Sequence, residues 1–232
     1  MHYVPVFISE SRARIFCFGY ALRHLVVKLM RKRLTAIGFA LIFMFILGSC
    51  GKSSLPDITT ISISKEGKVT HTIVEDFPEG EYDSKQLKES LESQVTEYNA
   101  KTSEQAAKLQ KFEVKDGKAR VVLEYATPQD FCNMNDNSPV FYYFYGTVAE
   151  AEQKGIVPEA LLYKDGNIKG VSVNANGIRK YPERHFMVLM ESAHVVLPQE
   201  ILFCTANVKP LGEGVADAVI KEPGEKAYIL TD

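Results

Sequence analysis

The feature that most constrains this chain is an uncharged, apolar run near its beginning, at residues 34–48, which is rich in Ile, Phe, Leu and Met. Three cations, Arg31-Lys32-Arg33, stand directly before the run. This charge asymmetry is the one that orients exported segments in a membrane. The run has about 15 residues, whereas a helix needs roughly 20 to span the hydrocarbon core. The stretch therefore fits the apolar part of a cleaved signal peptide better than a permanent membrane helix.

A short motif, Leu47-Gly48-Ser49-Cys50, closes this run. It resembles the lipobox of bacterial lipoproteins, with a leucine at the third position before a cysteine and two small residues next to it. In that family the cysteine thiol receives a diacylglycerol, and a dedicated signal peptidase cuts directly before the cysteine. The resemblance implies cleavage between Ser49 and Cys50, so that Cys50 becomes the first mature residue and carries two or three acyl chains, such as palmitate.

Lipid on Cys50 would act as the membrane anchor. At about 0.8 kcal/mol per buried methylene, one acyl chain holds a protein only marginally, whereas two or more hold it almost permanently. We therefore expect a protein anchored in the cell membrane and facing the extracytoplasmic side. An uncleaved N-terminal membrane anchor, in which Cys50 is incidental, is the alternative.

This interpretation divides the chain into four segments. Residues 1–29 are an over-extended start or a long leader, and residues 30–49 are the signal peptide. Residues 50–57 are the lipidated cysteine and a flexible tether of small and polar residues. Residues 58–232 are expected to form a single extracytoplasmic domain, although a softer boundary near Gly155 could divide it.

The charge balance excludes one class of partner. Residues 1–50 hold seven of the 27 basic residues and one of the 29 acidic residues, so the mature part has a net charge near −8. Nucleic-acid binding requires a basic face that displaces counterions from phosphates, and we expect no nucleic-acid partner. The same charge argues against electrostatic docking on anionic lipid.

The pattern of apolar residues predicts an α+β fold with a mainly antiparallel sheet built from hairpins. One long helix is expected over about residues 83–100, capped by Asp83. Its apolar stripe is Leu87, Leu91, Val95 and Tyr98. One or two short helices are expected, one after Thr127-Pro128 and one at Thr147, where Glu150 completes a capping box.

Strands are expected at residues 58–64, 69–74, 111–115, 118–125, 140–145, 161–163, 168–173, 185–190, 194–197, 201–205, 215–220 and 227–230. Turns between them are indicated by Asp116-Gly117, Asp165-Gly166, Asn176-Gly177 and Leu211-Gly212.

Two cysteines besides Cys50 belong to the mature part, Cys132 and Cys204. An exported pair could form a disulfide. Both follow a phenylalanine, so two buried free thiols are equally compatible with the sequence.

Three groups of residues have a possible chemical role. The aromatic run at residues 141–145 could be a stacking platform for sugars or peptides, but we favour a strand buried on both faces. Asn133, Asn135, Asp136 and Asn137 resemble a calcium loop only faintly, because the acidic ligands and the turn glycine of that motif are missing.

The third group is the histidines of the mature part, His71, His185 and His194. Glu191 has the same strand parity as His185, whereas His194 has the opposite one, so a single strand cannot direct both histidines to one metal. We therefore predict no metal ligand, cofactor or catalytic residue.

The sequence contains no helical zinc-protease motif, no nucleophile elbow and no phosphate-binding glycine loop. Our first hypothesis is thus a non-catalytic binding or structural domain of the cell envelope, with a protein of the envelope as a possible partner. A solute-binding receptor for a transporter is the alternative, and an envelope hydrolase is a second one.

Overall fold

The computed structural model describes residues 57–78, 83–135, 143–156 and 158–232, all within the unit Leu55–Asp232. The expected signal peptide and lipobox lie outside these residues. Within the described part of the chain, no helix combines the length and the apolar character needed to cross a membrane.

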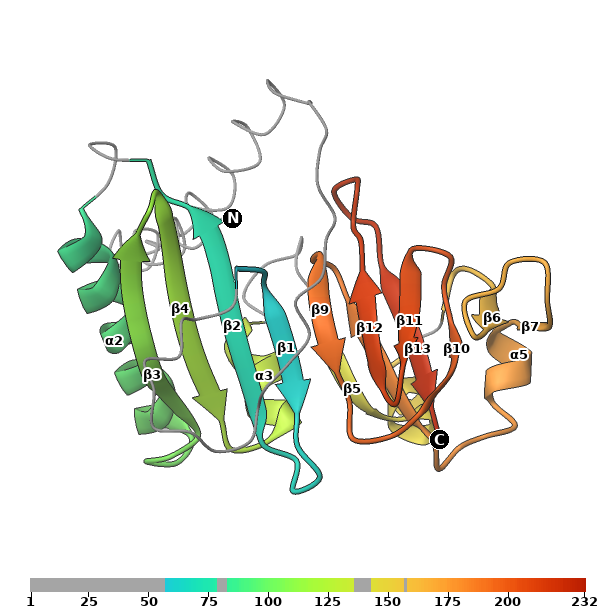
Figure 1. Cartoon of the computed structure of the whole chain (residues 1–232). Coiled ribbons are helices and arrows are strands. Elements are labelled where there is room, and N and C mark those ends of the chain that lie inside the picture. The colour runs from blue at the N-terminus through green and yellow to red at the C-terminus, as the bar shows by residue number, and fades with distance from the viewer. Residues whose placement is uncertain (1–56, 79–82, 136–142, 157) are drawn as a thin grey trace, which may run out of the picture. The chain divides into compact units, whose positions relative to one another are not determined.

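Four helices and thirteen strands make up the described fold (Figure 1). The helices are α2 (Ser84–Lys101), α3 (Pro128–Asn135), α4 (Val148–Gln153) and α5 (Ala175–Ile178). The strands are β1 (Thr60–Ile63), β2 (Val69–Asp76), β3 (Ala107–Lys115), β4 (Lys118–Tyr125), β5 (Phe144–Thr147), β6 (Leu162–Lys164), β7 (Ser172–Val173), β8 (His185–Leu189), β9 (Ala193–Val196), β10 (Ile201–Cys204), β11 (Val208–Gly212), β12 (Val215–Ala218) and β13 (Ala227–Thr231).

The strands form two sheets. A seven-stranded sheet has the order β11-β12-β9-β1-β2-β4-β3, and a six-stranded sheet has the order β5-β8-β13-β10-β6-β7. All neighbouring pairs are antiparallel except β1 and β9, which run parallel. The predicted mixture of helices and mainly antiparallel strands is confirmed, but two sheets take the place of the one that we expected.

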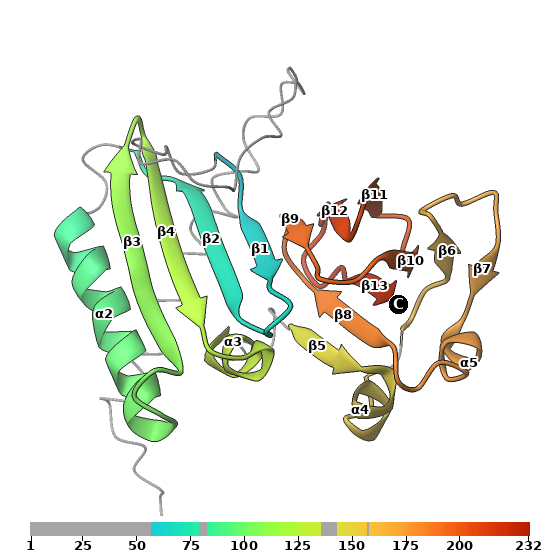
Figure 2. The same ribbon diagram turned by 60° about the horizontal axis from the view of Figure 1, so that its bottom comes forward.

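Strands from the second half of the chain contribute to both sheets. β8, β10 and β13 belong to the six-stranded sheet, whereas β9, β11 and β12 extend the sheet that β1 to β4 begin. Figure 2 shows β9 beside β1, although more than a hundred residues separate them in the sequence. Three of the strands that follow Gly155 therefore complete the seven-stranded sheet.

The six-stranded sheet is covered on both faces. Along β8, Met187 and Leu189 belong to a core cluster that also contains side chains of the seven-stranded sheet, α2 and α3. Phe186 and Val188 point to the opposite face and pack in a second cluster with residues of α4 and α5. This alternation follows from the two-residue period of a β-strand and explains why β8 is apolar throughout.

The helix α2 agrees with the expected range of about 83–100. The Asp83 carboxylate accepts hydrogen bonds from the backbone N–H groups of Lys85 and Gln86, as an N-cap does. Leu87 and Val95 are buried, and Leu91 and Tyr98 pack against the core. The Asn99 side chain bonds both backbone groups of Ala107, at 2.8 and 2.9 Å, which fixes the helix to β3.

The turn at Asp116-Gly117 is confirmed. Both residues have positive φ, 54° and 69°, which matches the twist that a two-residue hairpin loop needs. The capping box of α4 is also confirmed, because Thr147 and Glu150 bond each other's backbone N–H groups.

Several predictions about local structure are wrong. Leu211 and Gly212 do not form the predicted turn but belong to β11, a strand that we did not expect, and the turn follows at Glu213-Gly214.

The other errors concern residues 168–178. The Asn176-Gly177 pair is not a simple turn but part of α5, because the Asn174 side chain accepts a hydrogen bond from Gly177 N–H and caps a single helical turn. The described residues thus contain three short helices instead of one or two. The strand expected over residues 168–173 is reduced to β7, which has only two residues.

Candidate binding cleft

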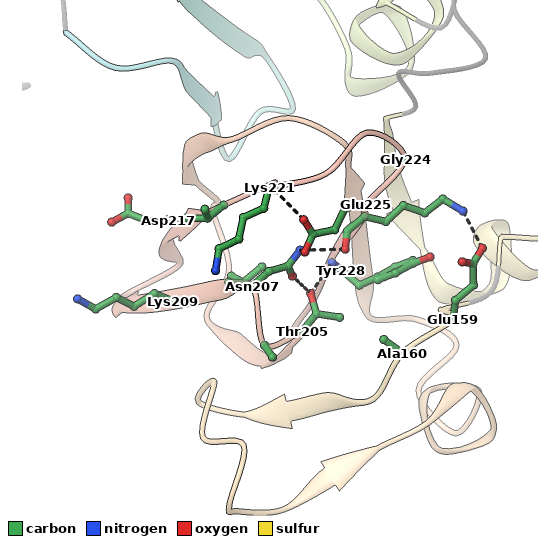
Figure 3. Close-up of a pocket in the computed structure, with 14 residues that line it drawn as sticks. Glu159, Ala160, Thr205, Asn207, Lys209, Asp217, Lys221, Gly224, Glu225 and Tyr228 are labelled. Carbon is green, nitrogen blue, oxygen red and sulfur yellow. Dashed lines mark hydrogen bonds and ion pairs between the residues drawn. The ribbon is translucent and has the colours of Figure 1, made fainter. Parts of the chain in front are cut away.

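An open cleft of about 670 Å³ is present in the described part of the molecule (Figure 3). It lies where β10 leads into β11 and where β12 leads into β13. Its lining residues are Glu159, Ala160, Thr205, Ala206, Asn207, Val208, Lys209, Asp217, Val219, Lys221, Gly224, Glu225, Lys226 and Tyr228. A volume of this size is in the range of sites for small molecules, about 300–1,000 Å³.

The base of the cleft is a hydrogen-bonded group around Thr205 and Asn207. The Thr205 hydroxyl donates to Asn207 Oδ1 at 2.6 Å and accepts from the Tyr228 backbone N–H at 3.0 Å. Asn207 Nδ2 donates to the Lys226 carbonyl oxygen and to Glu225, both at 3.1 Å. The polar side chains at the base of the cleft thus form hydrogen bonds with other groups of the protein.

The loop at residues 220–226 forms one wall of the cleft, and the Glu225 carboxylate joins the two ends of this loop. Glu225 Oε2 accepts hydrogen bonds from the backbone N–H groups of Lys221 at 2.7 Å and Glu222 at 3.3 Å. The bond from Lys221 is the main reason that the pKa of Glu225 is lowered, although partial burial opposes it. Glu225 is therefore held as a carboxylate that fastens the loop.

A second carboxylate at the cleft, Glu159, is paired with a lysine. Lys226 Nζ lies 2.7 Å from Glu159 Oε1, and this hydrogen bond raises the pKa of Lys226. The ring of Tyr228 is buried beside this pair, and its burial raises the pKa of the phenol.

The third carboxylate, Asp217, is paired with a histidine on the adjacent strand. Asp217 Oδ1 lies 2.8 Å from Nδ1 of His194, because the two residues are cross-strand neighbours on β12 and β9. On its other side, Asp217 is the cross-strand neighbour of Lys209 on β11.

Lys209 and Lys221 differ from Lys226 in their contacts. Within the described part of the chain, the ammonium groups of Lys209 and Lys221 form no ion pair, and both side chains are exposed. Figure 3 shows both ammonium groups on the side of the cleft where Asp217 lies, away from Glu159. The charge of Lys221 acts only weakly on Glu225, after the hydrogen bonds that this carboxylate accepts.

The predicted lipidation and cleavage residues, Cys50 and Ser49, lie outside the described residues. Cys132 on α3 and Cys204 on β10 are buried thiols and do not form a disulfide with each other. Burial raises the pKa of Cys204 to about 12, so this thiol is unreactive near neutral pH.

His71 is fully buried in the core. Its Nε2 lies 3.1 Å from Oε1 of Glu191, and its ring packs edge-on against Phe131 with 5.4 Å between ring centroids. Glu191, which has the same parity as His185, thus pairs with a different histidine. A side chain without solvent access has no route to a solute, so we interpret this pair as part of the core.

The other two histidines lie on different sheets. His185 stacks on Tyr145, with 5.3 Å between ring centroids, and its Nδ1 lies 3.4 Å from Gln199 Nε2. His194 pairs with Asp217 at the cleft. Among the described residues, no group of three or more potential ligands is placed to hold a metal ion.

The aromatic run is described only from Tyr143 onward. Tyr143 and Phe144 are both buried and belong to different core clusters, as expected for a strand buried on both faces. The strand β5 nevertheless lies at the edge of its sheet. The Tyr145 hydroxyl donates to Gln199 Oε1 at 2.8 Å.

Two residues of the faint calcium motif are described, and both belong to α3. Asn133 Oδ1 accepts a hydrogen bond from Gln129 Nε2, and Asn135 Nδ2 donates to the Tyr125 hydroxyl and to the Phe131 carbonyl. Asp136 and Asn137 lie outside the described residues.

Sequence reasoning did not single out the cleft. Its residues come from three separate segments, and none forms a recognisable motif with its sequence neighbours. The concentration of lysine and glutamate between β12 and β13 was the one available signal, and charged loops are too common to indicate a site.

Comparison of the chain with protein-family models, with curated proteins and with solved structures found no match.

Proposed function

We propose that this protein is a lipid-anchored, extracytoplasmic binding domain that takes up a small solute in the cleft around Asn207. The observation that carries the binding part is the cleft itself, which is open, of small-molecule size and built on a rigid hydrogen-bonded base. Delivery of the solute to a transporter is the receptor form of this proposal.

The anchoring part rests on the residue pattern alone. The cationic segment, the apolar run and the Leu47-Gly48-Ser49-Cys50 motif support export and lipidation at Cys50. By this proposal the acyl chains hold the domain at the cell membrane, and residues 51–57 act as the tether.

Export and lipidation can be tested with Cys50→Ala in cells fed labelled palmitate. We expect the variant to keep its signal peptide, to run larger than the wild type and to carry no label. Cys17→Ala, which removes a cysteine outside the motif, should be labelled and cut normally. A Cys50→Ala protein of mature size that stays in the membrane fraction would contradict the proposal.

Solute binding can be tested by the thermal stability of the full-length protein in detergent across a panel of metabolites. A ligand that binds only the folded state raises the melting temperature. We expect Ala160→Trp, which fills the cleft from its exposed rim, to abolish the shift. Ala100→Trp, on the exposed side of α2, should retain it. A shift that survives Ala160→Trp would place the ligand elsewhere.

A second candidate function, hydrolysis, is favoured by the His194–Asp217 pair. A carboxylate at Nδ1 orients an imidazole and leaves Nε2 to accept a proton from water, and Asp217 lines the cleft. Reproducible turnover of ester or cell-wall substrates that is lost in His194→Gln and retained in His185→Gln would favour this function over simple binding.

A further inference from the structure

We infer that the cleft recognises its solute through an anionic group, a carboxylate or a phosphate, which Lys209 and Lys221 bind. This inference rests on the proposed binding function and names the class of ligand.

The carboxylates and the lysines of the cleft differ in how far the protein already uses them. Three lysines and three carboxylates line the cleft, so its formal charge is balanced. Each carboxylate, however, already has a partner in the protein. Glu159 pairs with Lys226, Asp217 pairs with His194, and Glu225 accepts from two backbone N–H groups and from Asn207. Each carboxylate of the cleft therefore already takes part in the fold.

The lysine ammonium groups are the charged donors of the cleft. Of the three lysines, only Lys226 forms an ion pair among the described residues. The ammonium groups of Lys209 and Lys221 come from β11 and from the loop after β12, and they lie on the same side of the cleft (Figure 3). Each ammonium group offers three N–H donors and no acceptor, so the complementary group on a ligand must supply negatively charged oxygens.

A cationic solute is a poorer match to the cleft. A cation would need a carboxylate, and each of the three already binds a group of the protein that competes for its charge. Release of Glu225 would also free the loop at residues 220–226, which that carboxylate closes. An anion meets no such competition at Lys209 and Lys221, whose side chains are exposed to solvent.

The remaining surface of the cleft suits an organic body on this anion. Val219 is 43% exposed, and Ala160 and Ala206 also line the hollow. Apolar contact with these side chains adds to the charge interaction, as in most small-molecule sites. The expected ligand is thus a small organic carboxylate or phosphate ester.

The test is calorimetric titration of the full-length protein in detergent, at low salt, with two sets of probes. One set contains carboxylates such as succinate and citrate, and the other contains inorganic phosphate and glycerol phosphate. Succinamide and spermidine serve as neutral and cationic comparisons. The same titrations are repeated with the double variant Lys209→Gln, Lys221→Gln. A control of equal charge change is Lys164→Gln, Lys169→Gln, at exposed positions at the end of β6 and in the β6–β7 connection.

We expect at least one anionic probe to bind, with the cleft variant weakened at least tenfold, the control unchanged and the affinity falling as salt rises. The set that binds distinguishes a carboxylate from a phosphate. Equal binding by the cleft variant and the control would overturn the inference, as would a preference for the neutral or cationic probe.

The failure of this inference can be told apart from the failure of the proposed function. Binding of a neutral metabolite that Ala160→Trp abolishes would leave the binding function standing and remove only the anion. An absence of any ligand across both the probes and the metabolite panel counts against both.

Discussion

At the scale of single residues, Glu225 decides whether the wall of the cleft stays closed. Its carboxylate accepts two backbone N–H bonds within its own loop, and its pKa is lowered mainly by the bond from Lys221. The folded state therefore binds this proton less readily than the unfolded state does. The stabilisation is fully present above the ordinary carboxyl pKa of about 4.3 and is lost as the pH falls through the lowered value.

We expect Glu225→Gln to lower the free energy of unfolding by about 1 kcal/mol near neutral pH. The glutamine side chain is uncharged and has one acceptor oxygen, whereas both oxygens of the Glu225 carboxylate accept hydrogen bonds. The loss should shrink near pH 3, where the wild-type carboxyl is itself becoming protonated. Urea denaturation at both pH values measures the difference. Glu222→Gln, an exposed neighbour with the same change in charge, should have little effect at either pH. Equal effects of the two variants would contradict this role of Glu225.

The two buried cysteines give a second prediction at this scale. Because burial raises the pKa of Cys204 to about 12, almost none of this thiol is ionised near pH 8. We expect iodoacetamide to leave Cys204 unlabelled in the folded protein and to label Cys132 and Cys204 in urea without reductant. Peptide mass spectrometry reads both sites. A linked pair of peptides, unlabelled in urea, would instead reveal a disulfide.

At the scale of elements, the connection between β11 and β12 depends on one glycine. Gly214 has φ of +79°, and a Cβ atom there would lie 2.4 Å from the Leu197 carbonyl oxygen and 2.5 Å from that of Gln199. The backbone of the segment after β9 thus packs directly on this turn. Because β11 and β12 carry Lys209 and Asp217, the turn also holds one side of the cleft.

We expect Gly214→Ala to destabilise the protein by more than Gly155→Ala. Both positions have positive φ, which costs a residue with a Cβ roughly 1–2 kcal/mol, but the space around Gly155 is open. The extra loss at Gly214 is the steric conflict with two carbonyl groups. Thermal unfolding of the two variants compares them directly, and equal melting temperatures would show that the neighbouring segment can move aside.

At the scale of the whole molecule, the two halves of the chain are interleaved in one sheet. β1 pairs with β2 on one side and with β9 on the other, and the core cluster contains residues from β1 to β13. A fragment that ends near Gly155 would lack β9, which pairs with β1. It would also lack the side chains that the later strands contribute to the core cluster.

We therefore predict that a fragment of residues 58–155 does not fold cooperatively. Its circular dichroism should show no sharp thermal transition, whereas a fragment of residues 58–232 should melt in one step. The seven-stranded sheet would otherwise have to end at β1, with the apolar face of Ile61 and Ile63 uncovered. A sharp transition in the short fragment would show that residues 58–155 form a unit of their own.

Local patterns in the sequence were sufficient for most elements. The stripe from Leu87 to Tyr98 and the cap at Asp83 predicted α2, and Asp116-Gly117 predicted the β3–β4 hairpin, because these signals act within a few residues. The Asn176-Gly177 pair misled us, since the same two residues suit a turn and a capped helical turn.

The sequence by itself determined most elements of this protein and the expectation of a lipid anchor at Cys50, because periodicity, turn residues and a signal motif are local properties of the chain. Only the tertiary structure decided that β9, β11 and β12 extend the first sheet, that Glu191 pairs with His71, and that a cleft forms around Asn207. Strand order and cross-strand neighbours depend on contacts between distant segments, and these contacts have no local signature. Lys209 and Lys221 are ordinary surface residues in the sequence, and they gain significance only because the carboxylates around them already bind other groups of the protein.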